Sequence, residues 1–262
     1  MSSHVTLMSV AKSEWIKFRT VRSTIMGTIV LIVLTIGLGV LVTSLVRAHW
    51  STMPNVQKLT FDPVSTSLVG VIFAEFAVGV IGALFITSEY TSGAIRTTLA
   101  AVPNRLQLSF AKLLVLLVSM LVICEIVCIT AFLIGAAILS GVLVETPSLT
   151  NSADLRAVLF SGVYLTLLAA FSFALGLILR QSLACISVFV SLLLLVPLIG
   201  IAFPQSWQDH FQKFEPINLG GSMMSVVPNP NSFGPLHALV IMVLYVAVLI
   251  GVGVTLFRRR DA

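Results

Sequence analysis

The sequence predicts an all-α polytopic membrane protein with six transmembrane helices, and three observations support this fold class. Of the 262 residues, 58% are hydrophobic and only 10% are charged, whereas about a quarter of an average soluble domain is charged. Six separate runs are long enough for a helix to cross about 30 Å of hydrocarbon. Basic residues gather at both termini and between alternate runs. We expect a single membrane domain over residues 1–262.

The six expected transmembrane helices differ in how strictly they exclude charge. They cover residues 24–46, 67–87, 113–139, 157–179, 183–203 and 237–257. Four of them contain no Asp, Glu, Lys or Arg, whereas the second contains Glu75 and the third contains Glu125. A carboxylate inside a membrane costs a few kcal/mol or more to insert. These two side chains are therefore candidates for functional residues.

The basic residues predict the orientation of the chain, because cytoplasmic flanks retain Lys and Arg. With six spans, the two termini share one side of the membrane. Eleven basic residues fall on that side: Lys12, Lys17, Arg19, Arg22, Arg96, Arg105, Lys112, Arg180, Arg258, Arg259 and Arg260. Four fall on the other side: Arg47, Lys58, Arg156 and Lys213. We expect both termini in the cytoplasm, and we interpret the formal charge of +5 as a topology signal with no nucleic-acid partner.

Residues 1–23, before the first span, are expected to form an amphipathic helix that lies on the membrane lipid. At 100° per residue its apolar residues share one face: Leu7, Met8, Ala11, Trp15 and Phe18. Polar residues lie roughly opposite: Ser9, Ser13, Lys17 and Thr20. A basic helix with aromatic residues on its other face suits the headgroup region. The alternative is a soluble helix that packs on a partner.

The segment 88–105, after the second span, is expected to contain a cytoplasmic helix of about two turns. Gly93 permits a tight entry, and Pro103 ends a helix at or before the preceding residue. Ile95, Leu99 and Val102 form an apolar stripe at i, i+4 and i+7. A stripe this short cannot make a core alone, so we expect it to dock in a groove of another protein.

The loop 204–236 is expected to lie on the outer side as an interfacial or re-entrant segment, or as a cap over the bundle. It is too apolar for a free linker, since Trp207, Phe211 and Phe214 recur at helical spacing.

Catalytic signatures are absent from the sequence. It contains no GxxxxGK[ST], HExxH or GxSxG motif, and no GxGxxG motif after a strand pattern. Cys124, Cys128 and Cys185 lie inside the spans, where cysteine behaves as a small apolar residue. We therefore expect no catalytic residue, no metal site and no cofactor bound by this chain.

Glu75 and Glu125 leave two interpretations open. Glu75 precedes Glu89 by 14 residues and Glu125 follows Lys112 by 13, which predicts matching depths of about 20 Å on adjacent helices at 1.5 Å per residue. The carboxyls could form a substrate path or a proton-binding pair. Alternatively, each hydrogen-bonds a neighbouring helix and is kept protonated by burial.

Two segments resemble a known family. SEWIKFRTVRS before the first span and SEYTSGAIRTTLAAVPNRLQLSFAK after the second are similar to the two hallmark segments of ABC-2 type permeases, the membrane subunits of bacterial ABC exporters. Six spans with both ends inside and an apolar outer loop before the last span fit the same family. The resemblance covers essentially the whole chain and implies a location in the bacterial cytoplasmic membrane.

The resemblance implies that segment 88–105 carries the coupling helix, which fits a cleft of a separate ATPase. The implied coupling residues are Glu89, Tyr90, Gly93, Arg96, Leu99, Pro103, Arg105 and Lys112. The implied interfacial helix beside that partner contains Trp15, Lys17, Arg19 and Arg22. Two cytoplasmic ABC ATPase subunits with ATP and Mg, and a second permease copy in a homodimer or heterodimer, are implied partners.

The family exports amphiphilic or hydrophobic cargo such as drugs, antibiotics, peptides or lipids, so the resemblance does not fix the substrate. An alternative function is an ion-coupled secondary carrier that uses Glu75 and Glu125 as its proton site. Carriers often contain inverted repeats and broken helices, which are not evident here. An intramembrane enzyme ranks last because a catalytic pair is absent.

Overall fold

The computed structural model describes residues 6–143, 146–205, 208, 211–227 and 232–259, and among these it contains helices and turns but no strand. Six helical segments in this described part are long and apolar enough to cross a membrane, which confirms the predicted all-α polytopic class. They are the segment Arg22–Thr52 and helices α6 (Val71–Thr91), α8 (Arg105–Leu139), α9 (Ser152–Leu179), α10 (Ser182–Gly200) and α13 (Pro235–Arg259).

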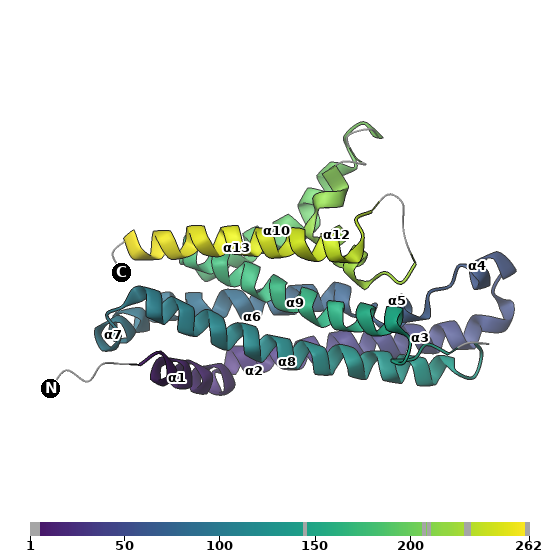
Figure 1. Ribbon diagram of the computed structural model, residues 1–262, viewed down its shortest axis with the longest axis horizontal. Helices are drawn as coiled ribbons and strands as arrows, with labels where there is room; N and C mark the ends of the chain where they lie inside the picture. The colour runs from purple at the N-terminus through teal and green to yellow at the C-terminus, as the bar shows by residue number, and fades with distance from the viewer. Residues whose placement is uncertain (1–5, 144–145, 206–207, 209–210, 228–231, 260–262) are drawn as a thin grey trace.

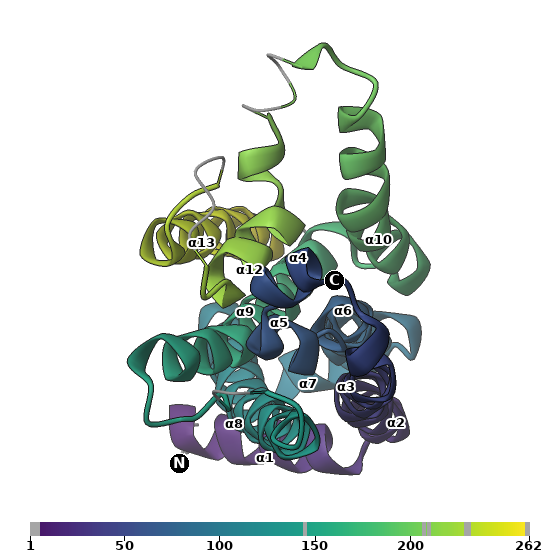
Figure 2. The same ribbon diagram turned by 90° about the vertical axis from the view of Figure 1, so that its right-hand side faces the viewer.

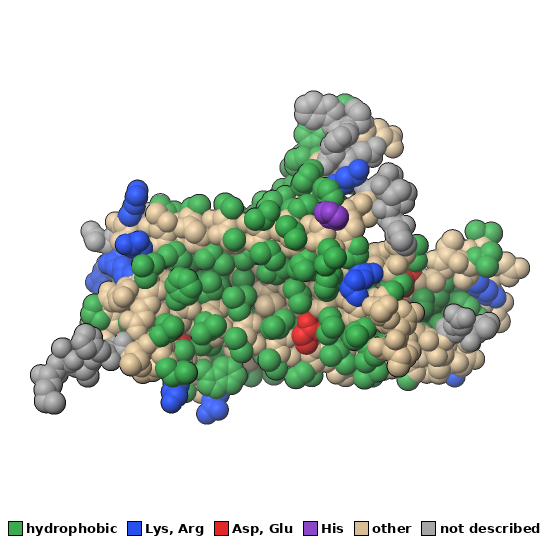
Figure 3. All heavy atoms as spheres, viewed as in Figure 1, with side chains coloured by type: hydrophobic (Ala, Val, Ile, Leu, Met, Phe, Trp, Pro, Cys, Tyr) green, Lys and Arg blue, Asp and Glu red, His purple; other side chains and the backbone are tan. Residues whose placement is uncertain are grey.

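The long helices run roughly alongside one another and define two ends of the bundle (Figure 1). The first and last described residues lie at one end, together with α1 (Leu7–Thr20) and α7 (Ala94–Ala101), and we call this the termini end. The short helices α4 (Asn55–Leu59) and α5 (Pro63–Ser67) lie at the other, which we call the distal end. Figure 3 shows an apolar flank between them, with Lys and Arg side chains gathered at the termini end.

Helix α9 is the centre of the bundle and packs against α6, α8 and α13. Small residues permit this packing. A Cβ atom at Gly82 of α6 would lie 2.1 Å from the carbonyl oxygen of Ala169 in α9, so the two backbones approach more closely than any side chain would allow. The Ser172 hydroxyl also donates a hydrogen bond of 2.7 Å to the Gly79 carbonyl. The small residues of α6 therefore serve packing within the chain.

The first transmembrane segment is a composite of four helical pieces. It consists of α2 (Arg22–Ile32), a π-helical turn η1 (Val33–Gly37), α3 (Leu38–His49) and the short turn η2 (Trp50–Thr52). Gly70, just before α6, lies against the widened turn: a Cβ there would be 2.3 Å from the Thr35 carbonyl oxygen. A π-helical turn of this kind often marks a functional position.

The second transmembrane helix begins four residues later than the sequence predicted. Asp62 caps the separate helix α5 by accepting hydrogen bonds from the amides of Val64 and Ser65, and Pro63 occupies the first helical position, where proline is favoured. The chain then turns before α6 starts at Val71. As a result, Glu75 lies about one turn from the distal end of α6.

The predicted outer segment folds back onto the bundle in part. Beyond α10 the chain projects sideways (Figure 2), and it returns through a short turn η3 (Gln212–Phe214) into α12 (Pro216–Met224). Helix α12 packs on α9 and α13 and buries Leu219 and Met223. Trp207 lies outside the described residues. Helix α12 thus caps the distal end of the bundle.

Candidate functional site

Segment 88–105 has the local structure that its sequence predicts. Gly93 adopts φ +73°, the left-handed conformation that glycine reaches without a steric penalty, and α7 begins directly after it. Helix α7 ends at Ala101, before Pro103. The side chain of Asn104 then accepts hydrogen bonds from the amides of Leu106 and Gln107 and caps α8. A two-turn helix therefore connects the ends of two long spans.

The apolar stripe of α7 faces its own chain, which differs from the expectation that it docks in a partner. Ile95 and Val102 are buried and Leu99 is half-buried against the core of the bundle. Arg96 and Thr97 are exposed on the opposite side. The stripe is short enough for the neighbouring helices to cover it. Any protein that contacts α7 must therefore use its exposed polar face.

Next to α7, a charge cluster joins three helices at the termini end of the bundle. It consists of Glu14 and Lys17 from α1, Glu89 from α6 and Lys112 from α8. The Lys112 ammonium donates to Glu14 Oε2 at 2.6 Å and to Glu89 Oε1 at 2.8 Å. The Lys17 ammonium donates to Glu14 Oε1 at 2.8 Å and to Glu89 Oε1 at 2.7 Å. The formal charges of the four side chains cancel.

The charge cluster is largely withdrawn from water. The side chains of Lys112 and Glu14 are only 1% and 2% exposed, and the Lys112 ammonium also lies 5.3 Å from the centre of the Phe85 ring. Burial alone would lower the pKa of Lys17, but hydrogen bonds and charge from Glu14 and Glu89 outweigh it and raise this pKa above its usual value. Such a network holds its helices in one arrangement, because each charge depends on the others for solvation.

Two arginines join α13 and the end of α9 to helices of the charge cluster. The Arg105 guanidinium donates to the Phe257 carbonyl oxygen of α13 at 3.1 Å. Arg180 follows α9 and lies 5.4 Å from the centre of the Tyr90 ring of α6. Arg105 and Tyr90 are therefore framing residues rather than members of the charge cluster.

The N-terminal helix presents two different faces. Trp15 and Arg19 are exposed on α1, and Arg22 is exposed at the start of α2. Trp15 stacks on Phe18 with ring centres 6.2 Å apart. The inward face carries Phe18 and the charge cluster. Glu14 was not predicted as a site residue, although a signal was present: it precedes Lys17 by one helical turn and is the single acidic residue of this helix.

A cleft of about 410 Å³ lies between α1 and α7. Ser9 and Ser13 line it from α1, Thr97 and Ala101 line it from α7, and Lys17 lies at its wall. The cleft thus separates the two amphipathic helices at the termini end, and Glu14 and Lys17 of the charge cluster line it.

Glu75 and Glu125 do not form the pair on adjacent helices that their spacing predicted. Helix α9 lies between α6 and α8, and its residues contact each carboxyl separately. Glu75 is buried beside Tyr164, whereas Glu125 is half-buried against Gly162, where a Cβ would lie 2.5 Å from the carboxyl carbon. These two positions of α9 are two residues apart and therefore point to different faces.

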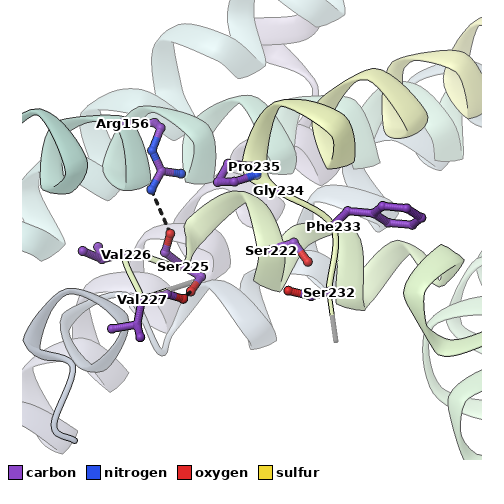
Figure 4. A pocket seen from close by; sticks show the side chains of 9 residues that line it. All are labelled: Arg156, Ser222, Ser225, Val226, Val227, Ser232, Phe233, Gly234 and Pro235. Carbon is purple, nitrogen blue, oxygen red and sulfur yellow. Dashed lines mark hydrogen bonds between the residues drawn. The ribbon is translucent and has the colours of Figure 1, made fainter. Parts of the chain in front are cut away.

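At the distal end, Arg156 fixes the C-terminal end of α12. Its guanidinium donates to the carbonyl oxygens of Met223 at 3.3 Å and Ser225 at 2.9 Å, a favourable arrangement for a cation at a helix C-terminus. Figure 4 shows Arg156 reaching Ser225 at the edge of a small hollow of about 120 Å³. Phe233 and Pro235, which lead into α13, line the same hollow.

Among the described residues, no three His, Cys, Asp or Glu side chains gather in one place. Cys124, Cys128 and Cys185 are buried, unpaired thiols inside the bundle.

Comparison with known proteins does not assign a family. No protein-family profile matches the sequence, and no curated protein matches it significantly. The chain is a multi-pass helical membrane protein by the length and apolarity of its helices.

Proposed function

We propose that this chain is the membrane subunit of an ATP-driven exporter similar to the ABC-2 type permeases. It forms the path for an amphiphilic or hydrophobic cargo, such as a drug, antibiotic, peptide or lipid, and has no enzymatic activity of its own. Two copies of a separate ABC ATPase, which bind ATP and Mg, supply the energy to a pair of permease subunits. The assembly lies in the bacterial cytoplasmic membrane with both termini in the cytoplasm.

The charge cluster is the observation that carries this proposal. Glu89 lies in the last turn of α6 and Lys112 lies two turns into α8, so the two helices that flank α7 are joined to each other and to α1 by ionic hydrogen bonds of 2.6–2.8 Å. A force applied to α7 or α1 reaches both spans through contacts that cannot slide without separating buried charges. An energy-coupling subunit needs such a connection between its docking surface and its spans.

The exposed face of α7 is suited to the partner. Arg96 and Thr97 are exposed on α7, and the cleft beside them is lined by the hydroxyls of Ser9 and Ser13. In this proposal the ATPase contacts this polar surface, while the apolar stripe stays within the permease.

Charge reversal at Arg96 tests the proposal. The chain is tagged after Ala262, extracted from its native host in mild detergent, and analysed for bound proteins and ATPase activity. We expect a stoichiometric soluble ATPase that is lost with Arg96→Glu but retained with Lys58→Glu, a matched reversal at the distal end. Retention of a fully active complex with Arg96→Glu would contradict the proposed docking surface.

The competing function is a proton-coupled carrier that uses Glu75 and Glu125. One observation favours this carrier function: Oε2 of each carboxyl is buried without a hydrogen-bond partner among the described residues. Their separation by α9 argues against a shared proton site. A carrier would transport in proteoliposomes under a pH gradient without ATP, and Glu75→Gln would abolish that transport.

A further inference from the structure

A cavity of about 300 Å³ lies at the distal end of the bundle between two helical faces. One face runs along α5 and the start of α6 and contributes Ser65, Ile72 and Glu75. The other face belongs to α12 and contributes Ile217, Asn218, Gly221 and Met224. Ser65, Ile72 and Gly221 are exposed at its rim, so the cavity is open to the surroundings of the bundle.

Glu75 gives this cavity its chemical character. The residue is 1% exposed, and its Oε2 has no hydrogen-bond partner among the described residues. The Tyr164 hydroxyl is the neighbouring donor to this carboxyl, in a geometry looser than a full hydrogen bond. A buried carboxyl oxygen without a donor is costly. A bound molecule that brings a donor would remove that cost.

Helix α12 covers the cavity and packs closely on α9. A Cβ at Gly220 would be 2.2 Å from the ring of Tyr164, so only glycine lets α12 rest on that ring. Arg156 fixes the C-terminal end of the same helix. On its cavity side, Gly221 faces open space, with no atom within 4 Å of a Cβ placed there.

We propose that this cavity binds the positively charged amine of an amphiphile, which is the cargo class of the exporter proposed above. The described lining contains a single ionisable side chain, Glu75, and no Lys, Arg or His, so a cation is complemented and an anion is not. Apolar residues such as Ile72, Ile217 and Met224 supply the contact for a hydrocarbon body. The volume suits a compact head group, with the remaining chain extending past the open rim.

Photolabelling of the purified chain in lipid nanodiscs tests this site. The probe is a ten-carbon primary amine with a diazirine on its chain, and the control probe is the alcohol of the same chain. We expect saturable labelling of the peptides that contain Ile72 and Met224 by the amine. Glu75→Gln should weaken amine labelling by about ten- to a hundred-fold, the range expected for a lost charged hydrogen bond, and should leave alcohol labelling unchanged.

Two further variants keep the test decisive. Glu125→Gln, the matched change on the other side of α9, should label like the wild type. Gly221→Leu adds a side chain into open space and should block labelling even if Glu75→Gln fails to fold. Equal labelling by amine and alcohol, or unchanged amine labelling in Gly221→Leu, would overturn the proposal.

The lipid composition of the nanodisc distinguishes two sources of the amine, a lipid head group and a soluble molecule. Competition by phosphatidylethanolamine in the nanodisc identifies a lipid head group as the natural occupant, and its absence identifies a soluble amine. Both results retain the amine site. Since labelling uses the permease without its ATPase, failure here leaves the co-purification test of the exporter proposal unaffected.

Discussion

Lys112→Met is the substitution that probes the charge cluster most severely. Methionine keeps the unbranched apolar stem of lysine but removes the ammonium that donates to both Glu14 and Glu89. The Lys112 side chain is 1% exposed and the Glu14 side chain is 2% exposed, so water cannot replace the ammonium without opening the structure. Loss of one member of a buried ion pair costs about 3–5 kcal/mol. Lys17 still contacts both carboxylates, so we expect the lower end of that range.

Hydrogen exchange of the α1 amides in detergent measures this effect directly. A cost of about 3 kcal/mol corresponds to α1 detaching at least about a hundred-fold more often. Lys12→Met, on the exposed side of the same helix, should exchange like the wild type. Exchange of α1 in Lys112→Met within about threefold of the wild type would refute the argument that the buried cluster holds this helix in place.

Further predictions concern α7, the α6–α9 contact and pH. Gly93→Ala should destabilise α7 by about 1 kcal/mol through backbone strain alone, because a Cβ there meets open space, and Gly93→Asn should recover most of the loss in the same exchange assay. Gly82→Ala forces a Cβ against the Ala169 carbonyl and should lower the thermal midpoint in detergent, whereas Gly251→Ala, with nothing within 4 Å, should leave it unchanged. Because folding raises the pKa of Lys17, its stabilising effect is complete at neutral pH and is lost as the pH rises above the ordinary lysine value. Protease resistance of α1 should therefore fall in that alkaline window, and Lys17→Met should remove this part of the pH dependence.

The six spans could be predicted from the sequence because a membrane imposes length and apolarity on each helix separately. The α7 region could be predicted for a related reason: Gly93, Pro103 and Asn104 act on the backbone next to them. Such local signals do not depend on which helices are neighbours.

The contacts between helices could not be predicted in the same way. Glu75 and Glu125 were expected at matching depth on adjacent helices, but α9 passes between α6 and α8, and the packing order of helices leaves no local mark in a sequence. Lys17 reaches Glu89 over 72 positions of the chain, and Glu14 reaches Lys112 over 98. The roles of Lys17 and Glu14 depend on α1 docking beside α6 and α8.

The most direct test of the proposed function is transport of a fluorescent amphiphilic amine in proteoliposomes, with the chain alone and with the ATPase that co-purifies with it. We predict accumulation that requires both the partner and ATP, and that is lost with Arg96→Glu while Lys58→Glu retains it. Transport by the chain alone, driven by a pH gradient without ATP, would contradict the exporter proposal.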